Sequence, residues 1–200
     1  MKQLHALLAS TAALVATGAA QAHTGHGAEH AAHSLVDSVS SGLAHPLLGP
    51  DHLLAMLAVG LWSAAALPAG RRVMGPLAFV AALMLGAALG AQGLVMPLLE
   101  PAIALSVVLM GALLLARQTL PGAAGLALVA AAGVMHGLAH GAEAPLGGGF
   151  AAYALGFMAS SMALHAAGLG LGARLLKLQP WVWRTLATLM GASGLLMLAR

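Results

Sequence analysis

Long apolar runs, separated by short turns that contain Pro, Gly or Arg, dominate the sequence. Six of these runs are long enough to cross a bilayer, which takes about 20 apolar residues in a helix. All six should be helical, because a backbone inside lipid must satisfy its own hydrogen bonds. The pattern predicts an all-α polytopic membrane protein with six transmembrane helices, over residues 43–67, 73–95, 98–116, 121–141, 147–172 and 181–199.

The segment before the first run predicts export. A positive charge at Lys2 precedes an apolar core over residues 6–20, and Ala20-Gln21-Ala22 is a small-x-small cleavage site. An uncleaved first helix is the competing interpretation, but the polar segment that follows is typical of an exported tail. We expect a signal peptide (1–22) cleaved after Ala22, a His-rich periplasmic tail (23–42) and a transmembrane domain (43–200).

The positive charges predict the orientation. If the mature N-terminus lies outside, the turns after the first, third and fifth runs are cytoplasmic. Only Arg200 then falls on the outer side. The rule that positive charges stay inside therefore predicts that both termini lie in the periplasm. The inner charges are Arg71, Arg72, Arg117, Arg174, Lys177 and Arg184.

Composition limits the partners and the chemistry. Hydrophobic residues make up 60% of the chain and charged residues 6%, so the main partner is the lipid bilayer. No basic cluster is interleaved with aromatic residues, which argues against nucleic-acid binding. The absence of cysteine excludes disulfides, thiolate metal sites and cysteine nucleophiles. A metal site in this chain must use nitrogen and oxygen ligands, with methionine sulfur as a further option.

The stretch "AHPLLGPDHLLAM" in the first run places polar groups inside an apolar helix. His45 and His52 flank two prolines, and Asp51 adds a carboxylate that would be costly to bury alone. Each proline removes a helical hydrogen bond, so we expect the first span to be broken at Pro46 and Pro50. Transporters place ion sites at such breaks, where protein or water covers the free backbone groups.

The stretch "MHGLAHGAE" closes the fourth run. His136, His140 and Glu143 are spaced i, i+4 and i+7, so they share one face of a helix. Two imidazoles one turn apart can chelate a metal. The pattern lacks the glutamate of the zinc-protease His-Glu-x-x-His motif, so it gives no support to that chemistry.

Together the two stretches predict a cation site between the first and fourth runs. Clustering so many polar groups at one depth would be an expensive way merely to join helices. Imidazole with carboxylate suits Ni, Co, Zn and Cu(II), whereas Mg and Ca prefer oxygen ligands. The predicted ligands are His45, Asp51, His52, His136, His140 and Glu143.

Other histidines and methionines allow two interpretations each. Met56 is an auxiliary ligand candidate, although packing is the simpler role for a methionine. His165, near Ser160 and Ser161, is better explained as a hydrogen-bonding partner between helices. The tail residues His23, His26, His30 and His33 are either auxiliary metal ligands or part of a solvated linker.

On these motifs the sequence resembles the HupE/UreJ family of nickel and cobalt permeases. Met135 stands where many members have Phe, and the polar pattern is otherwise intact. The resemblance is carried by His45-Pro46, Gly49 and Asp51-His52 in the first run and by His136-Gly137, Ala139-His140-Gly141 and Glu143 in the fourth.

The resemblance implies a secondary permease rather than an enzyme, with Ni(II) or Co(II) as the transported ion and no prosthetic group. Its role would be to carry metal from periplasm to cytoplasm for hydrogenase or urease maturation. One alternative is a membrane-anchored metal sensor or metallochaperone that binds nickel without moving it. Another is an intramembrane hydrolase with a metal-bound water, but no acidic residue stands as a general base in a protease-like motif.

Overall fold

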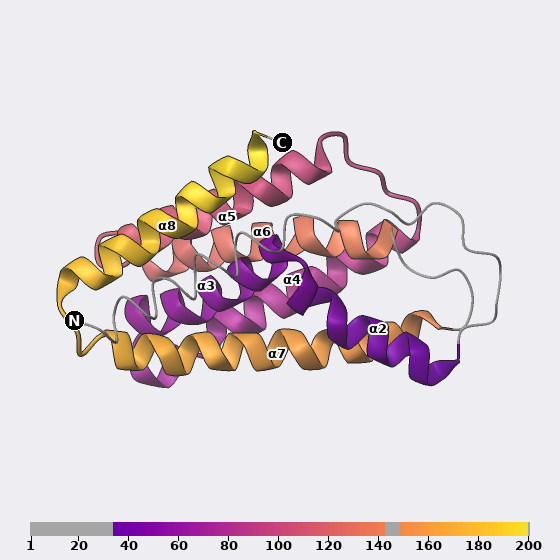
Figure 1. Ribbon diagram of the computed structural model, residues 1–200, viewed down its shortest axis with the longest axis horizontal. Helices are drawn as coiled ribbons and strands as arrows, with labels where there is room; N and C mark the ends of the chain where they lie inside the picture. Colours follow the sequence, from indigo (N-terminus) through magenta and orange to yellow (C-terminus); the bar gives the residue numbers. More distant parts are fainter. Residues whose placement is uncertain (1–33, 143–148, 200) are drawn as a thin grey trace.

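The computed structural model describes residues 34–142 and 149–199, and this part of the chain is all-helical, as predicted (Figure 1). The apolar runs correspond to successive helices joined by short turns. The elements are α2 (Leu35–Leu48), α3 (Pro50–Ala66), the 3-10 turn η2 (Ala69–Arg71), α4 (Met74–Ala91), α5 (Leu99–Leu115), α6 (Gly122–Ala142), α7 (Phe150–Leu175) and α8 (Pro180–Leu198).

Helix α2 begins at Leu35, eight residues before the first apolar run was expected to start. A capping box fixes this start. The Ser34 hydroxyl accepts a hydrogen bond from the Asp37 backbone N–H at 3.1 Å, and the Asp37 carboxylate accepts one from the Ser34 backbone N–H at 3.2 Å. The last part of the segment expected as a tail is therefore helical.

The helix break lies three residues beyond Pro46. Helix α2 continues through Pro46 to Leu48, Gly49 is extended, and Pro50 is the first residue of α3. Pro50 suits this position because the first residue of a helix needs no hydrogen-bonded N–H, and Pro46 removes only one bond near the end of α2. The two helices meet at an angle of 76°. Their crossing of a bilayer as one broken span stays a prediction.

Three segments are long and apolar enough to cross a membrane: residues 69–91, α6 and α7. The bent pair of α2 and α3 would make a fourth. Helix α5 is apolar but shorter, with 17 residues. Length and composition of the described residues therefore support three to four membrane spans, and the count of six stays a prediction.

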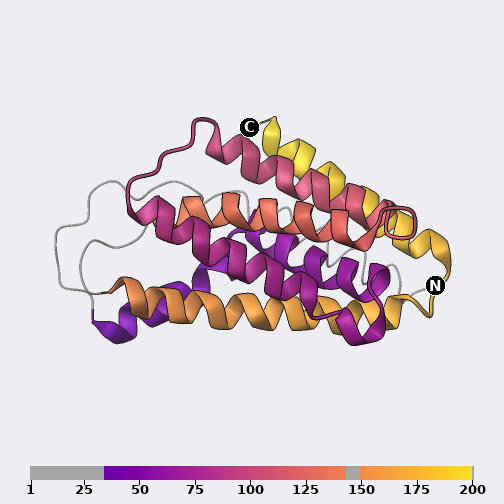
Figure 2. The same cartoon turned by 180° about the vertical axis from the view of Figure 1, so that it is seen from behind.

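Glycines bring helices together in close pairs. On α4, a Cβ atom at Gly86 would meet the backbone oxygen of Val134 on α6, and Gly111 of α5 lies in the same way against Gly191 of α8. Figures 1 and 2 show α4 beside α6 and α5 beside α8. Small residues let the backbones approach closely. Such packing drives helix association in a bilayer, because lipid tails leave no hydrophobic driving force between helices.

Helix α7 holds the bent pair in place. Gly42 of α2 lies against the backbone of Tyr153, and Gly60 of α3 lies against the backbone of His165. Figure 1 shows α7 running beside both helices. The one straight helix α7 thus contacts the chain on both sides of the break at Gly49. These close contacts fix the positions of α2 and α3 relative to each other.

The apolar core is formed by residues of α3 through α8. Trp62 and Phe79 are almost completely buried there, together with Met110. At the end of the bundle that carries the Arg-containing turns, Arg117 Cζ lies 4.7 Å from the centroid of the Trp183 ring. Burial gives the pKa of Arg117 a downward shift, to which nearby Arg184 adds. This basic end lies opposite the break at Gly49 along α3.

Replacing Gly86 by Ala should separate α4 from α6, because the added methyl group would meet backbone that cannot move aside. We expect a loss of about 1–3 kcal/mol in the free energy of unfolding, measured by denaturation in detergent. Gly170→Ala is the matched control, since no atom of the described residues lies within 4 Å of its added methyl group. Equal stability of the two variants would contradict the close packing of this pair.

Candidate metal centre

The break at Gly49 brings two histidines together. His45 lies in the last turn of α2 and His52 in the first turn of α3, and the centroids of their rings are 5.3 Å apart. The chain turns here with Gly49 N–H donating to the His45 carbonyl at 3.1 Å. Two residues that are seven apart in sequence are thus made neighbours by a bend and not by a continuous helix face.

Asp51 fixes the orientation of the His52 ring. The Nδ1–H of His52 donates to Asp51 Oδ1 at 2.6 Å, and the backbone N–H of His52 donates to the same oxygen at 2.8 Å. The His52 Nε2 atom is buried and has no hydrogen-bond partner among the described residues. Because Nδ1 carries the proton, Nε2 keeps its lone pair. A carboxylate behind an imidazole in this way is the usual support of a histidine that binds metal.

Gly49 leaves the space that this pair needs. A Cβ atom at Gly49 would lie 3.0 Å from Asp51 Oδ1 and 3.2 Å from His52 Nδ1. Its backbone angles are ordinary, so the requirement for glycine here is one of space. The first motif thus contains a ligand candidate, its carboxylate support and the gap that admits both.

Helix α6 contributes the third imidazole. The His140 ring lies 4.7 Å from that of His45 and 4.5 Å from that of His52, between centroids. Neither His140 nitrogen has a hydrogen-bond partner in the described part of the chain. The His140 ring also packs against the Phe157 ring of α7, with 4.1 Å between the ring centroids. A buried imidazole with both nitrogens unsatisfied is costly, unless a bound group completes it.

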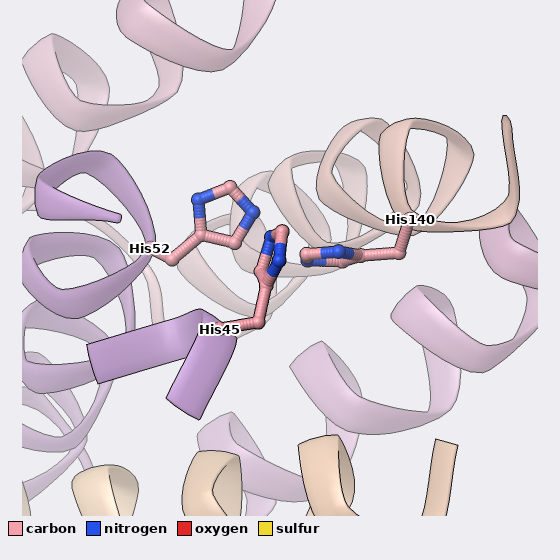
Figure 3. A group of neighbouring side chains, drawn as sticks. All are labelled: His45, His52 and His140. Atoms are coloured by element: carbon pink, nitrogen blue, oxygen red, sulfur yellow. The ribbon is translucent and has the colours of Figure 1, made fainter. Parts of the chain in front are cut away.

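His45, His52 and His140 form a possible metal site, which we term the histidine triad (Figure 3). Each offers one ring nitrogen, and these three atoms lie within 4.8 Å of one another. Nitrogens that share one ion at about 2.1 Å lie roughly 3–4 Å apart, so the triad would close by about an ångström on binding. His45 is partly exposed, whereas His52 and His140 are buried.

His136 lies one turn along α6 and outside the triad. Its ring is 4.8 Å from that of His52, and its Nε2 lies 2.9 Å from the Ser106 hydroxyl on α5. That hydroxyl donates its own proton to the Ile103 carbonyl, so it accepts the Nε2–H of His136. The Nδ1 atom of His136 therefore keeps its lone pair, is buried and has no partner within the described residues.

Met56 and Asp51 are predicted ligands that the structure describes outside the triad. Met56 is completely buried in the apolar core, one turn after His52, and Asp51 contacts His52 rather than the centre of the triad. Of the six principal candidates, the structure thus brings four imidazoles and one carboxylate into one cluster. Glu143 and the tail residues His23, His26, His30 and His33 lie outside the described residues.

Two elements that the sequence did not implicate complete the site. Ser106 of α5 orients His136, and Tyr153 and Phe157 of α7 line the side of His45 and His140. Ser106 is the only polar residue between Ala102 and Leu115, which could have drawn attention to it. The aromatic residues gave no such signal, because apolar side chains are ordinary in a membrane helix.

The helices and the site together define a class: an all-helical membrane protein with buried histidines gathered at a helix break. The profile of the family described as HupE / UreJ protein matches residues 11–197. This chain belongs to the HupE/UreJ family, as its motifs predicted. Among curated proteins it is 38% identical over 136 residues to Protein HupE of Rhizobium leguminosarum bv. viciae, covering 68% of this chain and 70% of that one. No solved structure gives a significant match.

Asp51→Ala should weaken metal binding without removing a triad nitrogen. The His52 ring would lose the acceptor that fixes its proton on Nδ1, and we expect about 10–100-fold lower affinity for Ni(II) by calorimetric titration in detergent. Asp51→Asn keeps an oxygen that accepts the same hydrogen bonds, so it should retain most of the affinity. If Asp51→Asn lowers the Ni(II) affinity as much as Asp51→Ala does, the carboxylate acts by its charge or as a direct ligand, not by orienting His52.

Proposed function

We propose that this protein is a secondary permease that carries Ni(II), with Co(II) as the other candidate ion, from the periplasm to the cytoplasm. In this proposal it lies in the bacterial inner membrane with both termini in the periplasm. Following the family resemblance, the metal supplies the maturation of hydrogenase or urease. The metal is cargo rather than a resident cofactor.

The histidine triad is the single observation that carries this proposal. Three imidazoles from α2, α3 and α6 converge, and one nitrogen of each lies within 4.8 Å of the others. Such a nitrogen set suits borderline divalent ions such as Ni(II) and Co(II), and it disfavours Mg²⁺ and Ca²⁺. With no cysteine in the chain, the very tight binding that thiolates give to soft metals is absent.

Two features favour passage over permanent binding. The triad consists of imidazoles without a thiolate, so it should hold a divalent ion less tightly than a thiolate site would, and a permeation site must release what it binds. In addition, His136 continues the series of imidazoles beyond His52, with its ring 4.8 Å away and its Nδ1 unsatisfied in the described chain. A protein that only bound the metal would not need His136 as a further imidazole beyond the triad.

His52→Ala and His140→Ala should each abolish uptake of Ni(II) into vesicles that contain the purified protein and an enclosed metal-sensitive dye. Each change removes one of three nitrogens, and two remaining imidazoles hold a divalent ion poorly. Gln92→Ala is the control, because this exposed side chain bonds only to Ala88 of its own helix in the described structure. We expect it to transport as the unchanged protein does.

The same vesicles separate the permease from its alternative. A permease fills the lumen with metal, whereas a sensor or metallochaperone binds Ni(II) and leaves the dye unchanged. Wild-type rates in either histidine variant would refute the triad as the transport site. An unresponsive dye with the unchanged protein, under conditions where it binds Ni(II), would refute transport itself.

A further inference from the structure

His165 of α7 is a buried histidine that the proposed site does not use. Its side chain is 2% exposed. The Nδ1–H donates to the Ser161 carbonyl at 2.7 Å, one turn back on the same helix. Because a carbonyl can only accept, the proton is on Nδ1 and the lone pair is on Nε2. This bond lies within α7, so it does not supply the contact between helices expected from the sequence.

The Nε2 atom of His165 is buried without a hydrogen-bond partner among the described residues. The Ser161 hydroxyl, one turn away on the same face, is also buried and unsatisfied in this part of the chain. A buried acceptor that lacks a partner has lost its hydrogen bonds to water and gained none in return. Two polar groups one turn apart on α7 are thus buried without a partner among the described residues.

His165 lies next in line after His136. The Phe79 ring of α4 contacts both imidazoles, with centroids 5.7 Å from His136 and 5.2 Å from His165. The His165 backbone packs against Gly60, which is about two turns beyond His52 along α3. Since α3 runs from the break toward the turn with Arg71, His165 lies on the side of the triad that faces the basic end.

We propose that His165 is an inner metal-binding position on the transport path. A divalent ion that leaves His52 and His136 passes the Phe79 ring and is next bound by His165 Nε2, with the Ser161 hydroxyl and water as further ligands. One imidazole with oxygen donors binds Ni(II) or Co(II) weakly, which suits the last position before release. This inference rests on the proposed permease function.

His165→Asn tests the position while preserving the local fold. The Asn amide N–H can still donate to the Ser161 carbonyl, but no atom replaces Nε2. Ser160→Ala is the matched control on the same helix, because the Ser160 hydroxyl already donates within α7, to the Gly156 and Phe157 carbonyls. Each protein is measured twice: for the initial rate of Ni(II) filling of dye-loaded vesicles, and for Ni(II) affinity by calorimetry in detergent.

We expect His165→Asn to lower the maximal uptake rate at least about tenfold, while Ni(II) affinity and the half-saturating concentration change less than about twofold. Ser160→Ala should leave all three values unchanged. His165→Met, which supplies a sulfur ligand without the hydrogen bond, should recover part of the rate.

Three results would overturn the inner position: an unchanged rate in His165→Asn, a loss of affinity that parallels the loss of rate, or a Met variant no faster than the Asn variant. The middle result would mean that His165 only supports the fold around the triad. Failure of the unchanged protein to fill vesicles is a different outcome, since it would refute the permease function on which this position rests.

Discussion

The constraint on which this structure depends is the cost of burying imidazoles whose nitrogens are left unsatisfied by the protein. His52, His136, His140 and His165 are all buried, and each has at least one nitrogen without a hydrogen-bond partner in the described chain. A bundle built for stability alone would satisfy or remove such groups. The proposed passage of a metal ion would give these groups, buried in an otherwise apolar interior, the partner that the described residues do not supply.

The fold supplies what this arrangement needs. The break at Gly49 brings the rings of His45 and His52 together, and α7 packs against both α2 and α3. Glycines hold α4 against α6, which fixes the helix that carries His136 and His140. Asp51 and Ser106 then determine which nitrogen of their histidine carries the proton. These hydrogen bonds thus leave the lone pair free on Nε2 of His52 and on Nδ1 of His136.

Much of this could be predicted from the sequence, because it follows from hydrophobicity and spacing. The all-α fold, the family, and the pairing of the first motif with the second were all readable from apolar runs and from polar residues placed inside them. The position of the break was less accessible. A proline near the end of a helix and a proline at its start have different effects, and only the second coincides with the break, beside Gly49.

The partners of the histidines could not be predicted, because they depend on which helices pack together. Ser106 lies 30 residues from His136 in sequence, and Phe79 joins His136 to His165 across three helices. The sequence offered Asp51 as a ligand, and only the geometry places its oxygen against the back of His52. The start of α2 at Leu35 is fixed by a capping box. This box lies in a polar segment, so hydrophobicity gives no sign of a helix there.

The most direct test of the account is an X-ray absorption spectrum of the nickel-loaded protein. It should show scattering from about three imidazole rings, the number in the triad, and one ring fewer after His140→Ala. A shell of oxygen atoms alone, or a spectrum that the His140 substitution leaves unchanged, would contradict the claim that these histidines converge to hold a metal ion.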